Sequence, residues 1–495
     1  MSNDLSLTND PRDRIIQELS ARNQELEARV EELEAKVERL LELLEGKAKA
    51  KSAKKPLFKE NYSLERNKTQ KDKQAKKEPK KTAGRKPTEE KLDQATKKID
   101  LYPENVSHAK CKFHRSQFVW RIFEGQALYV QYDIYDLPDS KNLPLPPGVR
   151  TSRSEFGIEI ILILAFLHYW IGISLDHAGE VTNYFTGLKL SKSQTESLLK
   201  QLANDWSEQY DTIAELLALQ MVVYIDETGW RVGQKHCYTW VFSTSMHVLF
   251  RCGVSRKKSE ATAVLGEDFA GIGVTDDYAA YKSMFTQHQL CWAHLIRKAI
   301  KLALQNPNET EYMEFLDQLC LLYHDAKSCQ NTEEISEATD EIVKQFQERV
   351  TLLCSRSDEK IITIKFAEKQ KPAINPTVDH LATFILLQRE LTNNLEKLFV
   401  FVEHAEVEPT NNLSERNVRR EAEIRKASRC SKSEKGAKRR GVIVTVLASL
   451  KTRIPNFTLA NVLLEIESWL KNGCSRFQEE LLALQSKRPP PIPDC

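Results

Sequence analysis

The sequence lacks the segments that would carry the chain to or through a membrane. It has no apolar N-terminal signal segment, and its only membrane-like run, Ile158 to Leu175, is interrupted by Glu159, His168 and Gly172. A spanning helix needs about 20 mostly apolar residues, so a buried helix is the better interpretation of this run. We therefore expect a cytoplasmic protein without a membrane partner.

Paired cysteines are also missing. Ten cysteines are scattered singly over 495 residues, without the spacing of a disulfide framework, which predicts a reduced cytosolic protein. A large net charge is absent as well, because the formal value is only +2 although 29% of the residues are charged. The length suggests about three domains, and 41% hydrophobic residues suffice for their cores.

What is present begins with a heptad segment, Ile16 to Leu44, inside residues 1–46. Val30 and Val37 stand at one core position with the polar Asn23, and the other core position holds Leu19, Leu26, Leu33 and Leu40. β-branched residues opposite leucine favour a parallel two-stranded coil, and one buried Asn fixes its register. The outward faces are almost wholly charged and offer nothing for docking on the protein body. We expect a coiled-coil dimerisation helix, giving a homodimer or higher oligomer, rather than a lone docked helix.

Residues 47–100 are rich in lysine and arginine and poor in acids and large apolar residues. Such a segment cannot bury enough surface to fold alone, so we expect a disordered basic linker. Its cations either bind phosphates by counterion release or are merely solvated, and the composition leaves both open. Gly84 to Pro87 contains Arg85 and Lys86, which are candidate minor-groove contacts.

A helical region is predicted over residues 151–220. A helix ends near Tyr184, Thr186-Gly187 makes a turn, and Ser191 caps the next helix. This order matches a helix-turn-helix, in which Lys192 and Gln194 would lie at the DNA-recognition end. An ordinary helical hairpin explains the pattern equally well.

Three carboxylates stand at positions suited to chemistry. Val222 to Ile225 predicts a short buried strand that ends at Gly229 and delivers Asp226 at its C-terminal end. A second apolar run leads in the same way to Asp276, and Glu415 begins a charged helical stretch. Two strand-end aspartates and a helix glutamate can hold two divalent cations for in-line phosphoryl transfer. Strand-end aspartates are also common turn and cap residues, so spacing alone does not establish the site.

The elements around these acids predict a core in two parts. Residues 221–305 give three antiparallel strands, a helix and a further strand, and residues 406–475 return to the same core. Roughly 140 residues separate Asp276 from Glu415, too many for a loop, so residues 306–405 are interpreted as a helical insertion. Residues 476–495 are predicted to be a disordered tail. Cations after Glu415 are candidate ligands for DNA phosphates, unless they form only a solvated basic helix: Arg416, Arg419, Arg420, Arg425 and Lys426.

Four segments together resemble the insertion-sequence-66 family of bacterial transposases. They begin at Asp226, Asp276, Gln289 and Pro409, and read DETGWRV, DDYAAY, QLCWAHLIR and PTNNLSER. Four matches in family order are far more specific than one motif. The resemblance implies a multidomain protein with an α/β RNase H-like catalytic core and a DDE triad formed by Asp226, Asp276 and Glu415.

The resemblance also implies the reaction and the partners. Two Mg²⁺ or Mn²⁺ ions held by the triad would support hydrolysis at a transposon end and attack of the freed 3′ hydroxyl on target DNA. The partners would be transposon ends and target DNA in the nucleoid, together with any accessory proteins of the element. Asp277 and Glu227 are the carboxylates most easily confused with the true ligands.

The resemblance also concerns a zinc module before the core and a helix near the acids. The family commonly carries a cysteine-rich zinc module near residues 101–150, but this chain offers only Cys111 with His108 and His114. Four ligands are needed, so we interpret the region as a degenerate zinc-finger-like module and expect no zinc. The helix with His294 and Arg297 lies near the acids in the family, where it would contact the scissile phosphate. A buried structural histidine is the more frequent case, so neither residue is included in the triad.

Three other functions remain open on the sequence. The chain could be a non-catalytic DNA-binding protein, in which the acids are dispensable. It could be another metal nuclease on the same fold, such as a resolvase or repair enzyme, which cuts DNA without joining it. It could also be a decayed or domesticated copy of an element, which the missing cysteine pairs would fit.

Overall fold

The computed structural model describes residues 88–138, 143–281, 283–330, 338–355, 380–428 and 430–486. The chain divides into Met1–Lys86 and Pro87–Cys495, and every described residue belongs to the second unit. The predicted coiled coil, most of the basic linker with Arg85 and Lys86, and residues 487–495 lie outside the described residues.

A small three-stranded sheet comes first. Helix α3 (Thr88–Gln94) precedes β1 (Lys97–Leu101), β2 (Lys112–Phe123) and β3 (Gln126–Asp136), in the order β1-β3-β2. Strands β2 and β3 form a hairpin whose turn residues, Glu124 and Gly125, both have positive φ, as a tight two-residue turn requires. This hairpin lies within residues 101–150, which were interpreted from the sequence as a degenerate zinc-finger-like module.

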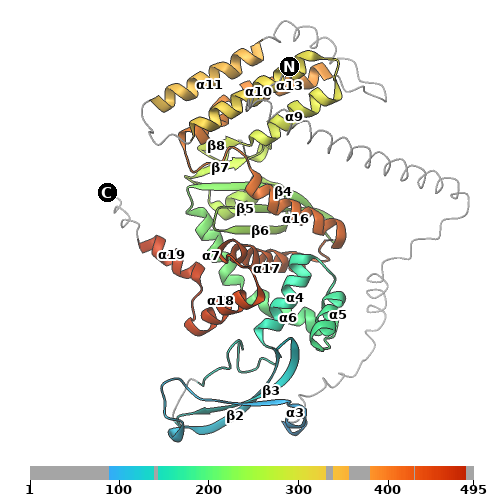
Figure 1. Cartoon of the computed structure of the whole chain (residues 1–495), viewed down its shortest axis with the longest axis vertical. Helices are drawn as coiled ribbons and strands as arrows, with labels where there is room; N and C mark the ends of the chain where they lie inside the picture. Colours follow the sequence, from blue (N-terminus) through green and yellow to red (C-terminus); the bar gives the residue numbers. More distant parts are fainter. Residues whose placement is uncertain are drawn as a thin grey trace, which may run out of the picture. The chain divides into compact units, whose positions relative to one another are not determined.

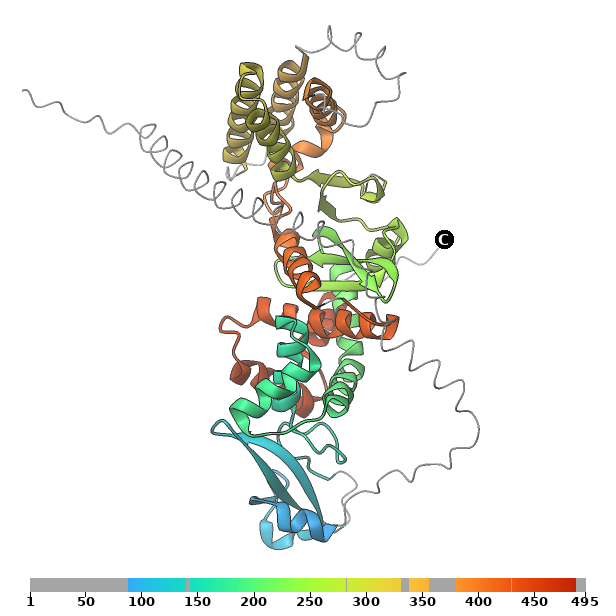
Figure 2. The ribbon, with the colours of Figure 1, turned by 90° about the vertical axis from the view of Figure 1, so that its right-hand side faces the viewer.

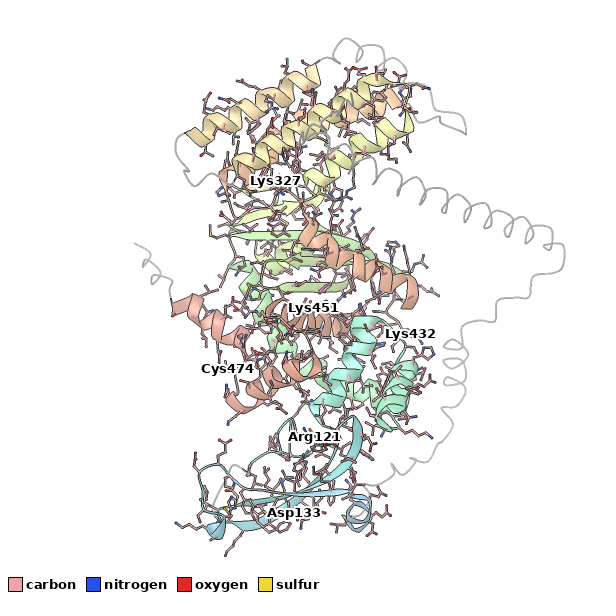
Figure 3. The ribbon with its side chains drawn as sticks, in the orientation of Figure 1. Arg121, Asp133, Lys327, Lys432, Lys451 and Cys474 are labelled. Carbon is pink, nitrogen blue, oxygen red and sulfur yellow. The ribbon has the colours of Figure 1, made fainter. Side chains whose placement is uncertain are left out.

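Arg121 connects this sheet to the helices that follow. Its Nε donates to the Glu159 carboxylate at 2.6 Å, and its Nη1 donates to the Pro147 carbonyl oxygen at 2.6 Å. Figure 3 labels Arg121 between the small sheet and the helices. Both charged side chains are nearly buried, with exposed fractions of 13% for Arg121 and 5% for Glu159. The glutamate that interrupts the apolar run is thus held through its Oε1 by a nearly buried ion pair, while its Oε2 is buried without a hydrogen-bond partner.

The helical region follows the predicted pattern closely. Helix α4 (Ile158–Ala165) continues into a π-helical turn (Phe166–Ile171), and α5 (Leu175–Thr186) ends at Gly187 in a left-handed conformation. Ser191 forms a reciprocal capping box with Gln194 at the start of α6 (Lys192–Asp205), and α7 (Ser207–Ala218) comes next. In the part of the chain described, no helix is long and apolar enough to cross a membrane.

A mixed five-stranded sheet forms the centre of the structure (Figure 1). Its strands are β4 (Val222–Val232), β5 (Lys235–Ser243), β6 (Val248–Val254), β7 (Ile272–Thr275) and β8 (Gln287–Leu290), in the order β6-β5-β4-β7-β8. The first three strands are antiparallel, whereas β7 and β8 run parallel to β4. Helix α8 (Lys258–Leu265) lies between β6 and β7 in sequence, as predicted.

Two helices from the C-terminal part complete this sheet. Helix α16 (Asn412–Ser428) packs on β4 and β5, and α17 (Glu434–Arg453) packs along the edge strand β6. The hydroxyls of Thr445 and Ser449 accept hydrogen bonds from the backbone N–H groups of Phe250 and Val248 at 2.9 and 3.0 Å. The helix therefore satisfies backbone groups that an edge strand would otherwise leave open.

A second hydrophobic cluster joins β7 and β8 to the helices of the predicted insertion. Helix α9 (Trp292–Gln305) packs against α10 (Thr310–Cys329) and α13 (His380–Thr392), and α11 (Ala338–Ser355) covers both of these partners. The short helices α14 (Leu395–Leu398) and α15 (Val400–Glu403) lead back towards the sheet. Figure 2 shows α9, α10, α11 and α13 grouped beyond β8.

Two predictions about element ends are wrong. Gly229 does not end β4, because it pairs with Tyr238 inside a ladder that continues to Val232. Residues 476–486 are not a disordered tail, because they form α19 (Arg476–Ser486) after α18 (Leu459–Asn472), and the Phe477 side chain is fully buried. Phe477 packs edge-on against Trp469 of α18, and this apolar contact fixes a segment that looks polar in sequence.

Candidate active site

The two aspartates lie at the same edge of the sheet. Pairing between β4 and β7 ends at Tyr224 and Val274, and β7 itself ends at Thr275. Asp226 therefore lies just beyond the last parallel pair, and Asp276 directly follows the neighbouring strand. Because β4 and β7 are parallel, their carboxyl ends deliver both side chains to one region, as open α/β sheets do at their sites.

Asn411 brings Glu415 to this edge. Its Nδ2 donates to the Ile225 carbonyl oxygen at 2.7 Å, and its backbone N–H donates to the Cys291 Sγ at 3.1 Å. Its carbonyl oxygen accepts from the Glu415 backbone N–H at 3.0 Å, in the first turn of α16. One buried asparagine thus joins the strand of Asp226, the start of α9 and the helix of Glu415.

The three acids influence one another electrostatically. Burial raises the pKa of Asp226 to about 8, and the charges of Glu227, Asp276 and Glu415 add to this shift. The backbone N–H of Glu227 donates to Asp226 Oδ1 at 2.8 Å and opposes the shift only in part. The raised pKa therefore reflects first the burial of the Asp226 carboxyl and second the neighbouring negative charges, and a bound cation would relieve both.

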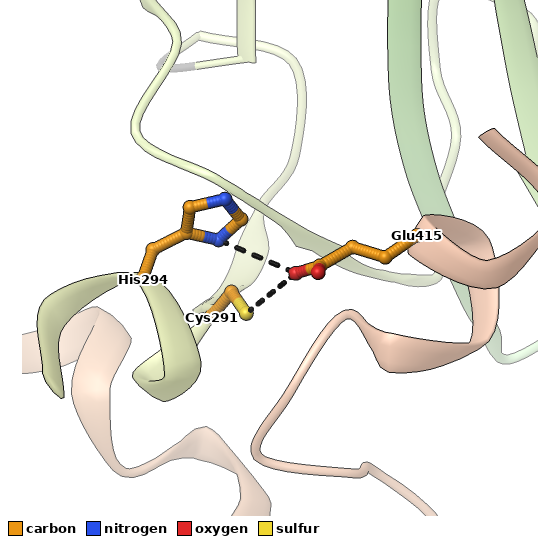
Figure 4. Close-up of side chains that lie close together, drawn as sticks. All are labelled: Cys291, His294 and Glu415. Atoms are coloured by element: carbon orange, nitrogen blue, oxygen red, sulfur yellow. Dashed lines mark hydrogen bonds and ion pairs between the residues drawn. The ribbon is translucent and has the colours of Figure 1, made fainter. Parts of the chain in front are cut away.

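The Glu415 carboxylate is directed towards α9 (Figure 4). Its Oε1 lies 3.6 Å from Cys291 Sγ and 3.5 Å from His294 Nδ1, and Arg297 Nη2 donates to both of its oxygens at 3.0 and 2.9 Å. Cys291, His294 and Glu415 are the group of possible metal ligands found within 4.8 Å of one another among the described residues. Asp226 and Asp276 are not part of that group, so holding one ion with all three acids requires Glu415 to exchange partners.

Neither Cys291 nor His294 is poised as a charged group. Burial raises the pKa of the Cys291 thiol to about 11. Burial also lowers the pKa of His294, although the Glu415 carboxylate opposes that shift. A neutral thiol and a neutral imidazole therefore stand beside Glu415 near neutral pH.

Glu227 serves the structure of the site. Its carboxylate is 3% exposed and accepts from Arg256 at 2.5 and 2.8 Å, and from the Tyr281 hydroxyl at 2.5 Å. The Arg256 guanidinium also lies over the Tyr278 ring, 3.8 Å from its centroid. Because its oxygens are already engaged, Glu227 is a weaker candidate ligand than Asp226.

Two open grooves border the site, one at Asp276 and the other at Glu415. One of about 310 Å³ is lined by Arg256, Asp276, Asp277, His294 and Lys298, among others. The other is lined by Tyr224, Glu408, Glu415, Arg416 and Arg419, among others. The predicted cations Arg416 and Arg419 are exposed and lie in the same groove as Glu415.

The remaining predicted DNA contacts fare differently. The prediction that Arg420 contacts a DNA phosphate is wrong. Its three guanidinium nitrogens are buried, and the guanidinium lies 3.4 Å from the centroid of the Trp170 ring. Arg420 therefore supports packing and is not available to a phosphate. Arg425 donates to the Gly229 carbonyl oxygen at 2.7 Å, and Lys426 is exposed. Lys192 pairs with Asp176, while Gln194 is used in the capping box, so both predicted recognition side chains have intramolecular partners.

Several contributors to the site carry no distinct sequence signal. Asn411, Cys291 and Arg256 act through contacts between residues far apart in the chain, and Tyr281 reaches Glu227 in the same way. Asn411, Cys291 and Tyr281 fall inside the motifs quoted above, and this membership is their only indication in the sequence, whereas Arg256 lies outside all four motifs.

Comparison with known families agrees with this geometry. A family model described as "Transposase IS66 family" matches residues 153–439, which include Asp226, Asp276 and Glu415. No curated protein matches the chain. Because the match covers more than half of the sequence, this chain belongs to the IS66 family of transposases.

Proposed function

We propose that this transposase catalyses metal-dependent DNA strand cleavage and strand transfer, with Asp226, Asp276 and Glu415 as its DDE triad. The observation that carries the proposal is the convergence of three elements: Asn411 joins β4 to the first turn of α16 and also donates to Cys291 Sγ. The backbone N–H of Cys291 donates in turn to the Thr275 carbonyl oxygen at the end of β7, at 2.9 Å. The raised pKa of Asp226, to which Asp276 and Glu415 contribute, supports a shared site.

We further propose that the five-stranded sheet is an RNase H-like core. The strand order β6-β5-β4-β7-β8, with β6, β5 and β4 antiparallel and β7 and β8 parallel to β4, supports this assignment. The catalytic acids would then come from the central strand, its parallel neighbour and a helix on the sheet. Residues 306–405 would be an insertion into this core.

Divalent cations fit the donor set. Three carboxylates offer hard oxygen ligands, which select Mg²⁺ or Mn²⁺. Burial, with the added charges of Glu227, Asp276 and Glu415, disfavours an unpaired charge on Asp226. When bound, such cations supply Lewis-acid activation of the attacking oxygen and stabilise the leaving 3′ oxygen. Asp226, Asp276 and Glu415 would hold them, provided that Glu415 releases Arg297.

The chain's own residues have defined tasks in this proposal. Asp226 must give up its proton before it serves as a ligand, which occurs more readily as the pH rises towards 8. Arg297 orients Glu415 in the absence of substrate and becomes available to a DNA phosphate when Glu415 turns. Arg416 and Arg419, in the groove beside Glu415, would hold the DNA backbone.

The other parts of the chain would serve assembly. We propose that the N-terminal heptads join two copies, so that two transposon ends are held together in the nucleoid. The helices of residues 151–220 would contribute to DNA binding.

The test is strand transfer of a pre-cleaved transposon end into target DNA in Mg²⁺. Asp226→Ala, Asp276→Ala and Glu415→Ala are each expected to lose joined product while retaining DNA binding, because each removes an essential ligand. Asp268→Ala, an exposed aspartate outside the site, is the matched control and should retain activity. Activity that survives Asp276→Ala but is lost in Asp277→Ala would move the second ligand to Asp277. A wild-type protein that binds the ends but never joins them would instead favour a decayed, DNA-binding copy.

A further inference from the structure

A basic groove lies between α6 and the first turns of α17, which contact each other. It encloses about 730 Å³, and its walls carry four cations, Lys200, Lys435, Lys438 and Arg439, against one acid, Glu196. That acid is already paired with Arg439 at 3.6 Å. The groove therefore has an excess of positive charge that its own walls do not neutralise.

The three lysines are available to a ligand. Lys200, Lys435 and Lys438 are all exposed, and within the described ranges no carboxylate lies within ion-pair distance of any of them. The nearby acid Glu434 is paired with Lys235 at 2.7 Å, and Asp205 is paired with Arg150. This contrasts with Lys192 of the same helix α6, whose ammonium group is held by Asp176.

The helices explain why the groove is polar. On α6, Thr195, Leu198, Leu199 and Leu202 face the core, which turns Ser193, Ser197, Lys200 and Asn204 towards solvent and the groove. On α17, Ser433 caps the N-terminus, so the positive end of the helix dipole lies next to Lys435 and Lys438. Cations, neutral hydrogen-bond donors and a helix N-terminus on the two walls of one groove form an arrangement that suits phosphate oxygens.

We propose that this groove binds the phosphate backbone of duplex DNA, as a contact surface separate from the grooves around the catalytic acids. It shares none of its lining residues with either of those grooves. The proposal rests on the proposed function, because it takes DNA as the substrate. Its contacts are to phosphates, so they contribute affinity and orientation without reading sequence.

The experiment measures how DNA affinity depends on salt. Fluorescence anisotropy of a labelled random-sequence duplex is followed with the full-length protein over a series of salt concentrations, in EDTA so that no catalysis occurs. The variant combines Lys200→Gln, Lys435→Gln and Lys438→Gln. Each phosphate contact adds about 0.9 to the slope of log affinity against log salt, so the slope should become shallower by roughly two to three.

A matched control removes the same charge elsewhere. It combines Lys110→Gln, Lys112→Gln and Lys327→Gln, three exposed lysines in the turn before β2, in β2 and in α10. Its slope should remain that of the wild type, and thermal unfolding should show both variants folded, since all six side chains are exposed. Equal slopes for the groove variant and the wild type, or equal reductions in both variants, would overturn the proposal.

The two proposals fail separately. If the groove variant has a shallower slope than the wild type but the wild type performs no strand transfer, the groove proposal stands and the catalytic proposal is wrong. If the wild type performs strand transfer but the groove variant has the slope of the wild type, the catalytic proposal stands and the groove proposal is wrong.

Discussion

Asp226 makes folding depend on pH. Its carboxyl has a pKa of about 8 in the folded chain against an ordinary value of 3.8, so between about pH 4 and pH 8 the folded state keeps a proton that the unfolded state has lost. The stability that this proton contributes is present in full below pH 4 and is lost as the pH rises through 8. Asp226→Asn, which has no charge to bury, should therefore gain stability relative to the wild type as the pH rises.

Chemical denaturation in EDTA at pH 5 and pH 8 measures this difference. We compare the free energy of unfolding of Asp226→Asn with that of the wild type. The difference in favour of the variant should be larger at pH 8 than at pH 5 by a few kcal/mol, since one pKa unit corresponds to about 1.4 kcal/mol. Asp268→Asn, at an exposed position, should show no such pH dependence. A difference that is the same at both pH values would mean that Asp226 ionises normally in the folded protein.

At the scale of residues, the sequence predicted which carboxylates to examine but not what surrounds them. The strand-end pattern pointed to Asp226 and Asp276, the head of a charged helical stretch pointed to Glu415, and the family resemblance joined the three as a proposed triad. Arg420 was misjudged because its partner, Trp170, lies in a helix some 250 residues earlier, and a cation–π contact leaves no periodic signal. The same holds for Asn411, whose role depends on the carbonyl of Ile225.

At the scale of elements, the contact between α17 and β6 predicts opposite changes in stability for two glycine-to-alanine substitutions in the same helix. A Cβ at Gly441 would lie 2.7 Å from the Phe250 carbonyl oxygen, so Gly441→Ala should destabilise the protein although alanine favours helix. A Cβ at Gly436, in the same helix, would meet only the Ser433 hydroxyl at 3.4 Å. Gly436→Ala should therefore be neutral or stabilising by up to about 1 kcal/mol.

Urea unfolding of the two variants checks this pair. We expect Gly441→Ala to lose on the order of 1 to 3 kcal/mol, as overpacked positions do. Stabilisation of both variants would show that α17 can move away from β6 at little cost.

Local rules explain which elements were predictable. Ser191 and Gly187 mark helix ends through their own side chain and backbone, so the sequence located α5 and α6 correctly. The end of β4 was predicted too early because Gly229 pairs with Tyr238 of β5 and the ladder continues beyond it. The sequence of β4 alone does not indicate this cross-strand partner. Helix α19 was missed because burial of Phe477 against α18, rather than helix periodicity, defines it.

At the scale of the whole molecule, the expected dimer remains a prediction, since residues 1–46 lie outside the described part of the chain. Deleting these residues should halve the molecular mass measured by light scattering, because the heptads supply the proposed contact. Strand transfer of a single transposon end into target DNA should survive the deletion, whereas joining of two paired ends should fall. A truncated protein that keeps its mass would place the dimer contact elsewhere.

Asn23→Val is a second test, since a polar core residue fixes the register of a coiled coil and its loss should permit higher oligomers.

The hydroxyls of α17 that cover β6 also bear on what happens to incomplete copies of the protein. A polypeptide that stops before Glu434 retains the five sheet strands but loses the helix that protects the outermost one. An uncovered β edge is a template for pairing with other chains, so such fragments would aggregate or be degraded. Interrupted genes would thus rarely leave a stable product that competes with the intact protein for DNA.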